Sequence, residues 1–242
     1  MSKVVLVTGS SIGIGKATII EFASHGYNVV INYLTNEEKA NELKKYVEDN
    51  YNVKALCIKC DVSNEYDVLN MISEIESEFG KVDVLINNAA IAIDTTFEDK
   101  TPDNFMKTLN VNLVGPFIVS KHAKNIMNRG SIINVASTNG IDTYYPYSMD
   151  YDASKAGLIL LTHNLAIEFS PNVRVNAVAP GWVSTDMNRE LDPEYIKAEQ
   201  KKILLGRFAE PEEIAKVIYF LASDEAKYIN NEIIRIDGGF NA

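Results

Sequence analysis

The sequence of 242 residues is poor in the side chains that most often bind metals or form disulfides, with only two cysteines and three histidines. Cys57 and Cys60 stand three apart, and no second ligand pair accompanies them, so no metal site is predicted. The segment before Cys60 is predicted as a strand over residues 53–58, on which positions three apart face opposite sides of a sheet. The two thiols are therefore expected to have a structural role only.

Long hydrophobic runs and a surplus of positive charge are also missing. No stretch approaches the roughly 18 uninterrupted apolar residues of a membrane span, and an apolar strand pattern begins at Lys3, so we expect no signal peptide, no membrane partner and a cytoplasmic location. The 23 basic residues are outnumbered by 33 acidic ones, which gives a net charge of −10. Nucleic-acid binding is not expected, because phosphate contacts need a basic surface.

Short apolar segments alternate with longer amphipathic ones along the whole chain, and 46% of the residues are hydrophobic. This alternation predicts βαβ units around a parallel sheet, and the length suits one domain. We predict an α/β, single-domain Rossmann fold over residues 1–242, a doubly wound seven-stranded parallel sheet with helices on both faces. The expected strands are 3–8, 27–33, 53–58, 82–87, 131–136, 173–178 and 232–236. The expected helices include 17–23, 37–49, 64–79, a start at 101–102, 110–127, 151–169 and 211–222.

Two longer segments, 139–150 and 181–205, interrupt this alternation. Both follow the carboxyl ends of predicted strands, where ligands bind in sheets of this kind. The second contains the apolar and aromatic residues Trp182, Met187, Leu191, Tyr195 and Ile203. We therefore predict that residues 181–205 form a mobile lid over a substrate.

A glycine-rich turn, Gly9-Ser10-Ser11-Ile12-Gly13-Ile14-Gly15, follows the first predicted strand and precedes an amphipathic stretch. A dinucleotide-binding loop works in this setting of strand, glycine turn and helix. Glycines allow positive φ and close approach of the backbone to a pyrophosphate at the helix N-terminus. On its own, the Gly-x-x-x-Gly-x-Gly spacing is as consistent with a plain tight turn as with a phosphate site.

Tyr151 and Lys155 are four residues apart in a predicted helix and therefore lie on one face of it. A phenol has a pKa of about 10, and we expect the neighbouring cation to lower the pKa of Tyr151. A phenol tuned in this way exchanges a proton with an alcohol or carbonyl oxygen. Tyr144, Tyr145 and Tyr147 lack a lysine four positions further on, so they are expected to line a substrate pocket or to pack the loop.

Together these motifs resemble the short-chain dehydrogenase/reductase family over essentially the whole chain, and within it the 3-oxoacyl-acyl-carrier-protein reductases and glucose-dehydrogenase-like members. The segment from Thr8 to Gly15 is similar to the family's Thr-Gly-x-x-x-Gly-x-Gly loop. Asn87-Asn88-Ala89-Ala90 is similar to its Asn-Asn-Ala-Gly motif, with Ala90 in place of glycine. The remaining matches, in chain order, are Asn112, Ser137, Tyr151-x-x-x-Lys155 and Pro180-Gly181.

The resemblance implies an NAD(P)-dependent enzyme that transfers a hydride between nicotinamide and a ketone or secondary alcohol. Tyr151 would be the general acid in reduction and the base in oxidation, and Lys155 would lower its pKa and hold the nicotinamide ribose. Ser137 would hydrogen-bond the substrate oxygen, and Asn112 would hold a water that links Lys155 to solvent. Asp61 would meet the adenine amino group. The implied cofactor contacts are Gly9, Ser11, Ile12, Gly13, Ile14, Gly15, Asn32, Tyr33, Asp61, Val62, Asn88, Ala89, Ala90, Tyr151, Lys155, Pro180, Gly181, Val183 and, at the carboxamide, Thr185.

The choice between NADP and NAD depends on the end of the second strand. This end, Asn32-Tyr33-Leu34, has no Asp or Glu to bind a ribose 2′-hydroxyl, which argues against NAD. Basic residues for a 2′-phosphate are also missing before Lys39, and Ile12 stands where many NADPH-dependent relatives carry Arg. We predict NADP over NAD. The expected donors to the phosphate are Asn32, Tyr33, Thr35 and Asn36.

The sequence leaves the substrate open. A small or medium ketone or its alcohol is expected, with a carrier-protein 3-oxoacyl thioester or a glucose-type sugar as alternatives. The net charge of −10 argues against docking of an acidic carrier protein, although Arg129, Lys201, Lys202 and Arg207 remain candidates for a basic patch.

Two other functional classes and the assembly state complete the predictions. A non-catalytic nucleotide-sensing protein should have lost Tyr151 or Lys155, and a methyltransferase would not need Ser137 in register with them.

The family resemblance implies a homotetramer built on the helices that carry the asparagine and the Tyr–Lys pair. Apolar residues on those helices are Val119, Ala123, Ile126, Leu158, Leu161, Leu165 and Ile167.

Overall fold

A computed structural model describes residues 2–185 and 191–240 of the chain. Within them, the strands form one seven-stranded parallel sheet in the order β3-β2-β1-β4-β5-β6-β7, which confirms the predicted fold class. The strands are β1 Val4–Val7, β2 Asn28–Tyr33, β3 Ala55–Lys59, β4 Val84–Asn87, β5 Gly130–Val135, β6 Val173–Pro180 and β7 Ile233–Ile236. Parts of the predicted domain and lid, residues 1, 186–190 (which include Met187) and 241–242, lie outside the described residues.

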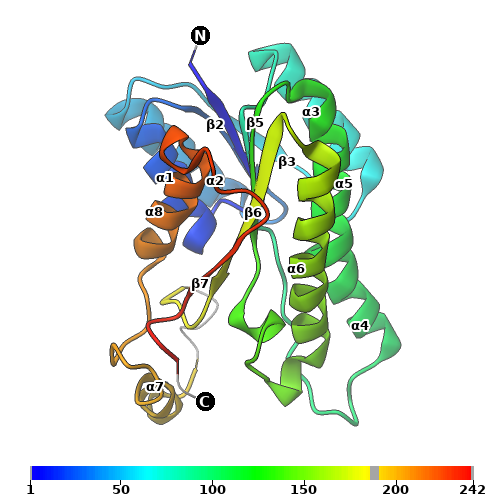
Figure 1. Cartoon of the computed structure of the whole chain (residues 1–242), viewed down its shortest axis with the longest axis vertical. Coiled ribbons are helices and arrows are strands. Elements are labelled where there is room, and N and C mark those ends of the chain that lie inside the picture. The colour runs from blue at the N-terminus through cyan, green and yellow to red at the C-terminus, as the bar shows by residue number, and fades with distance from the viewer. Residues whose placement is uncertain (1, 186–190, 241–242) are drawn as a thin grey trace.

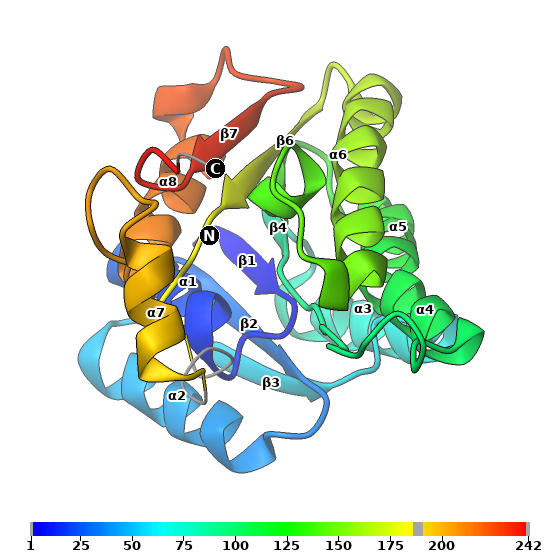
Figure 2. The same cartoon turned by 90° about the horizontal axis from the view of Figure 1, so that it is seen from below.

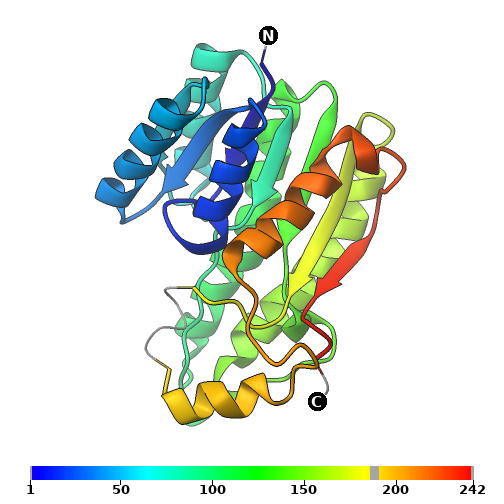
Figure 3. The ribbon, with the colours of Figure 1, turned by 90° about the vertical axis from the view of Figure 1, so that its left-hand side faces the viewer.

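Helices cover both faces of this sheet (Figure 1). On one face lie α1 Gly13–Ser24, α2 Glu37–Asn50 and α8 Pro211–Ala222, and Figure 3 shows this side. On the other face lie α3 Glu65–Phe79, α4 Pro102–Leu109, α5 Gly115–Ala123 and α6 Met149–Phe169. Helix α7, Pro193–Gln200, lies beyond the carboxyl ends of the strands, at the edge seen in Figure 2. No helix of the described ranges has the length and apolarity needed to cross a membrane.

Strand β1 shows why the sheet needs both helical layers. Val4 and Leu6 are buried against α3, α5 and α6, whereas Val5 and Val7 are buried against α1 and α8. Each such side chain stabilises the fold by about 1.5–3 kcal/mol when it leaves water. A strand buried on both faces therefore reads as a continuous apolar run, as the sequence does here.

The two cysteines lie on opposite sides of the sheet, as expected for a strand. Cys57 packs with the cluster around α1, α2 and α8, and Cys60 with the cluster around α3 and α5. Both thiols are free. Burial raises the pKa of Cys57 to about 11 and that of Cys60 to about 12. Protonated thiols of this kind are unreactive.

The predicted helix start at 101–102 is confirmed, but the helix predicted at 110–127 continues from it and is not regular. It starts at Pro102, where the hydroxyl of Thr101 accepts a 3.1 Å hydrogen bond from the third helical residue. A π-helical turn, Asn110–Val114, then joins α4 to α5, with the Gly115 N–H bonded to the Asn110 oxygen. Pro116 explains the widening, because it has no N–H to donate to the carbonyl four residues before it.

Candidate active site

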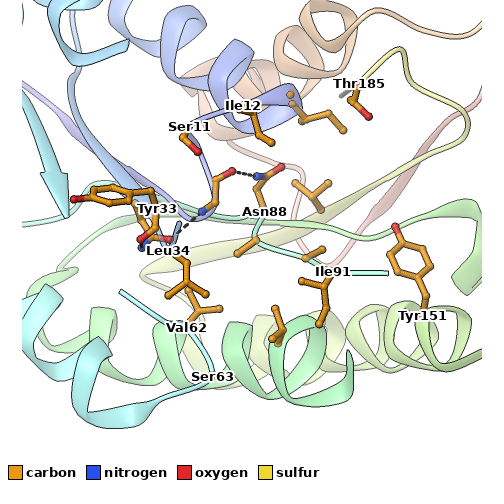
Figure 4. A pocket seen from close by; sticks show the side chains of 18 of the residues that line it. Ser11, Ile12, Tyr33, Leu34, Val62, Ser63, Asn88, Ile91, Tyr151 and Thr185 are labelled. Carbon is orange, nitrogen blue, oxygen red and sulfur yellow. Dashed lines mark hydrogen bonds between the residues drawn. The ribbon is translucent and has the colours of Figure 1, made fainter. Parts of the chain in front are cut away.

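A cavity of about 850 Å³ opens at the carboxyl ends of the strands, beside the point where the sheet order reverses between β1 and β4 (Figure 4). Ligands bind at such switch points in doubly wound sheets. Of the predicted site residues, those that line this cavity are Gly9, Ser11, Ile12, Gly13, Ile14, Asn32, Tyr33, Asp61, Val62, Asn88, Ala89, Ala90, Ser137, Tyr151, Lys155, Pro180, Gly181, Val183 and Thr185. Gly15 and Asn112 do not line it.

The glycine loop is shaped for the close approach of a ligand. Gly9 and Gly13 have φ values of 60° and 57°, which side-chain-bearing residues rarely adopt. A Cβ at Gly9 would lie 2.8 Å from the Ala89 Cα, and one at Gly15 only 2.7 Å from the Gly9 oxygen. Helix α1 begins at Gly13 without a side-chain cap or an acidic residue in its first turn. Its free N–H groups therefore face the cavity as the pyrophosphate of a dinucleotide requires.

Asn32 and Asn88 hold this loop in place. The Asn32 side chain accepts a 2.9 Å hydrogen bond from the Gly9 N–H and donates to the Cys60 oxygen at 3.1 Å. Asn88 donates to the oxygens of Thr8 and Gly9 at 2.9 and 3.0 Å. The loop is therefore anchored to β2, β3 and β4 before any ligand arrives.

The same contacts correct one expectation about the 2′-phosphate. Asn32 is buried and its amide is used in the loop, while the Tyr33 side chain points away from the cavity (Figure 4). Neither side chain is free to donate to a phosphate. Leu34, Thr35 and Asn36 line the cavity at this end instead.

Asp61 lies at the end of β3 with its carboxylate partly used. One oxygen, Oδ1, accepts hydrogen bonds from the Ser63 N–H and hydroxyl at 2.9 and 2.7 Å. This arrangement fixes the carboxylate at the cavity wall and leaves Oδ2 for an amino group.

Ser137, Tyr151 and Lys155 come together at the other end of the cavity. The Ser137 hydroxyl is close enough to Tyr151 to lower its pKa, and it accepts a hydrogen bond from the Asn139 N–H at 3.2 Å. Lys155 Nζ lies 5.4 Å from the centre of the Tyr151 ring and donates to the Val135 oxygen at 2.7 Å. A substrate oxygen next to Tyr151 would therefore lie close to the hydroxyls of Ser137 and Tyr151, with the amine of Lys155 nearby.

The predicted lowering of the Tyr151 pKa is wrong for this structure. Burial raises the pKa of Tyr151 to about 12, and the Ser137 hydroxyl offsets this only in part. Burial also lowers the pKa of Lys155 to about 7. Desolvation is the largest cause of both shifts, and sequence spacing does not reveal it.

Asn112 is fully buried, and its amide is committed to the fold. Its Oδ1 accepts from the Ile91 N–H, and its Nδ2 donates to the Ile91 oxygen, both at 2.9 Å. Nδ2 also donates to the Ser154 hydroxyl at 3.1 Å. The side chain therefore ties the segment after β4 to α6, and the expected water contact of Asn112 stays a prediction.

Aromatic residues pack within and beside the predicted lid, residues 181–205. Trp182 stacks on Phe208 with ring centres 5.3 Å apart and donates to Glu199 at 3.2 Å. Tyr195 of α7 and Tyr145 are close enough to influence each other's pKa. Of the three tyrosines considered beside Tyr151, Tyr145 thus packs the loop, whereas Tyr144 and Tyr147 are exposed.

The expected basic patch is partly neutralised. Lys202 is paired with Glu199 at 2.7 Å, and Arg207 contacts Glu213 with both terminal nitrogens at 2.6 and 2.7 Å. These pairs reduce the positive charge that this region offers to an acidic partner.

The sequence analysis did not predict the cavity wall that α4 and the following turn provide. The signal was present, because Asp103, Met106, Lys107 and Asn110 follow the i, i+3, i+4, i+7 spacing of one helix face. The further lining residues are Cys60, Ser63, Ile91, Val111, Val135 and Ala136. Among the described residues, no cluster of three or more His, Cys, Asp or Glu is placed to hold a metal ion.

Comparisons with known proteins cover nearly the whole chain. A family model described as enoyl-(acyl carrier protein) reductase matches residues 9–241. The 3-oxoacyl-acyl-carrier-protein reductase of Aquifex aeolicus is 39% identical over 98% of this chain and 96% of its own. The enzyme of that name from Staphylococcus aureus is 38% identical over 99% and 98%. A solved short-chain dehydrogenase/reductase from Serratia marcescens superposes with a TM-score of 0.94 at 33% identity, covering 99% of this chain and 98% of that one.

Proposed function

The chain belongs to the short-chain dehydrogenase/reductase family, and we propose that it reduces small or medium ketones with Tyr151 as the general acid. It is an NAD(P)-dependent oxidoreductase. The observation that carries the proposal is one cavity that holds both the glycine loop and the Ser137–Tyr151–Lys155 cluster. A non-catalytic nucleotide sensor would not need the second half of that cavity.

The proposed chemistry follows from the protonation of these groups. When bound, the reduced nicotinamide supplies the hydride to the carbonyl carbon. Ser137 and Tyr151 orient the carbonyl oxygen, and Tyr151 Oη donates its proton to the alkoxide, a far stronger base than phenolate. A Tyr151 pKa raised to about 12 keeps the phenol protonated at neutral pH, which suits an acid in reduction. Lys155 would hold the ribose hydroxyls.

For the cofactor we propose NADP over NAD. In support, no carboxylate side chain ends β2, where NAD-binding sheets place one for the 2′-hydroxyl. Leu34, Thr35 and Asn36 line the cavity there. Without a bidentate Arg the site would discriminate weakly. A kcat/KM ratio that favours NADH by about tenfold or more, about 1.4 kcal/mol, would overturn this choice.

A dedicated 3-oxoacyl-acyl-carrier-protein reductase is the second candidate, supported by the names of the curated relatives. Against it stand the net charge of −10 and the pairing of Lys202 and Arg207 with glutamates. The test compares kcat/KM for an acetoacetyl group on carrier protein with the same group on a short thiol. A gain above about 100-fold on the carrier, worth about 2.7 kcal/mol and lost in high salt, would replace our proposal with this one.

The direct test of the activity is a substrate screen that follows NADH and NADPH absorbance. Acetoacetyl thioesters, simple ketones, sugars and secondary alcohols would be compared. We expect turnover of ketones in the reducing direction at neutral pH. Turnover of sugars alone would contradict the proposal.

We also propose a homotetramer. Most of the helix residues considered for its interface face the sheet: Val119, Ala123, Ile126, Leu158 and Leu165 are buried. Leu160 and Ile167 of α6, at 65% and 75% exposure, and Phe117 of α5 remain as apolar surface. Light scattering that gives the mass of a single subunit, 26.9 kDa, would contradict this proposal.

A further inference from the structure

A buried ion pair lies directly beside the residue that we propose as the acid. Lys100 Nζ is 2.9 Å from Asp150 Oδ1, and the two side chains are only 3% and 0% exposed. The Thr108 hydroxyl donates to the other oxygen of Asp150 at 2.7 Å. Asp150 immediately precedes Tyr151 in the chain.

These three residues join segments that are far apart in the sequence. Lys100 precedes α4 and also donates to the Ile93 oxygen in the segment after β4. Thr108 lies in the last turn of α4, and Asp150 in the first turn of α6. None of the three lines the cavity, so they act on a bound ligand only through other residues.

The first turn of α6 depends on such contacts because its own cap is missing. Ser148 precedes the helix but makes no capping hydrogen bond, and its hydroxyl bonds to Asp94 instead. Tyr151 is the third helical residue, within the turn that frays most readily. The carboxylates on either side of Tyr151 are both anchored: Asp150 to α4, and Asp152 to Asn139 and the Tyr145 N–H at 2.7 and 2.9 Å.

Resting on the proposed function, we propose that Lys100, Thr108 and Asp150 are positioning residues that lock the first turn of α6 and so hold Tyr151 in register with Ser137. Burial alone would raise the pKa of Asp150, but the hydrogen bonds from Lys100 and Thr108 outweigh it and lower that pKa. The carboxylate therefore stays charged and takes both donors. Removing one partner of the ion pair leaves the other as an unpaired buried charge, which destabilises the turn. Neutralising both partners leaves no buried charge.

The test uses the whole chain and four variants. Lys100→Met breaks the pair, Thr108→Val keeps the pair but removes one donor, and Lys100→Met with Asp150→Asn makes both groups neutral. Glu168→Gln is the matched control, because it breaks the exposed Lys124–Glu168 pair on the same helix. Each variant is measured for amide hydrogen exchange over 149–155, for NADPH dissociation constant, and for kcat with the ketone that the wild-type screen identifies.

We expect exchange over 149–155 to speed up in Lys100→Met and, less strongly, in Thr108→Val, with kcat lowered about tenfold and about threefold. NADPH affinity should stay within about twofold of wild type, since the glycine loop is untouched. The double variant should recover slow exchange and a kcat within about threefold of wild type, and Glu168→Gln should match wild type.

Unchanged exchange in folded Lys100→Met and Thr108→Val overturns the proposal, as does a kcat within about twofold of wild type in both. A double variant no better than Lys100→Met also overturns it. If Lys100→Met does not fold, hydrogen exchange and kcat of Thr108→Val and of the double variant decide whether the proposal holds. Faster exchange in a protein whose wild type turns over no ketone would contradict the proposed function but leave the anchoring of α6 standing.

Discussion

Lys155 and Tyr151 face each other across one turn of α6, with the lysine nitrogen 5.4 Å from the centre of the phenol ring. The amine does not dominate the phenol, because Lys155 is buried and already donates to the Val135 oxygen, and because desolvation is the largest cause of the Tyr151 pKa shift. The result is a phenol that keeps its proton at neutral pH and an amine whose pKa is lowered to about 7. This arrangement suits the proton donor that we propose.

The titration of Tyr151 in the free protein follows from this burial. Since burial raises its pKa to about 12, the phenolate should appear well above the pH at which exposed tyrosines titrate. An ultraviolet difference titration of wild type minus Tyr151→Phe isolates this group. Ionisation near neutral pH would show that Lys155 lowers the pKa of Tyr151 after all.

The rate of the phenol-dependent step of alcohol oxidation should accordingly increase as the pH rises, since this step needs the phenolate.

Lys155→Ala should damage both binding and rate. The lysine lines the cavity beside Tyr151, so its loss removes the proposed ribose contacts as well as the nearby amine. We expect a weaker NADPH dissociation constant and a kcat lowered about 100-fold or more. Fluorescence titration with NADPH and steady-state rates separate the two effects. A variant that binds NADPH normally would contradict the ribose role.

Gly9→Ala should abolish cofactor binding without unfolding the protein. Its Cβ would lie 2.8 Å from the Ala89 backbone at a φ of 60°, so the loop must move. Gly26→Ala is the matched control, because Gly26 also has a positive φ, 78°, but a Cβ there meets nothing within 4 Å. Both variants carry backbone strain of about 1 kcal/mol or more. Equal NADPH affinity in the two would refute a binding role for the Gly9 turn.

Leu34→Asp should turn the cofactor preference towards NADH. Leu34 is half-exposed at the cavity edge after β2, where a carboxylate would bind the 2′-hydroxyl and repel a 2′-phosphate. We expect the ratio of kcat/KM for NADPH to that for NADH to fall about tenfold or more. Leu34→Asn, with similar shape but no charge, is the control. If both variants leave the ratio unchanged, the 2′ position lies elsewhere.

Local patterns predicted the sheet and the edge at which a ligand binds, whereas the individual cavity residues were expected from the family resemblance. Apolar strands and amphipathic helices have distinct periods, and residues at the carboxyl ends of parallel strands must meet at one edge. Of the predicted site residues, Asn112 lies behind the cavity wall and not in it, since its amide is taken by Ile91 and Ser154.

Features that depend on burial or on distant partners escaped sequence analysis. The sign of the Tyr151 pKa shift follows from desolvation. The π-helical turn at 110–114 depends on the missing N–H of Pro116 within a continuous helix, which the apolar periodicity does not show. Lys100 and Asp150 are 50 positions apart, and only the packing of α4 on α6 brings them together.

The most direct test of the account is the single-turnover rate of Tyr151→Phe. This change removes the hydroxyl that donates the proton but keeps the ring that packs in the cavity wall. With saturating NADPH and the ketone that the wild-type screen identifies, we predict an NADPH dissociation constant within about twofold of wild type and a rate lowered by about 10³-fold or more. A folded Tyr151→Phe protein that oxidises NADPH within a few-fold of the wild-type rate would contradict the assignment of Tyr151 as the general acid.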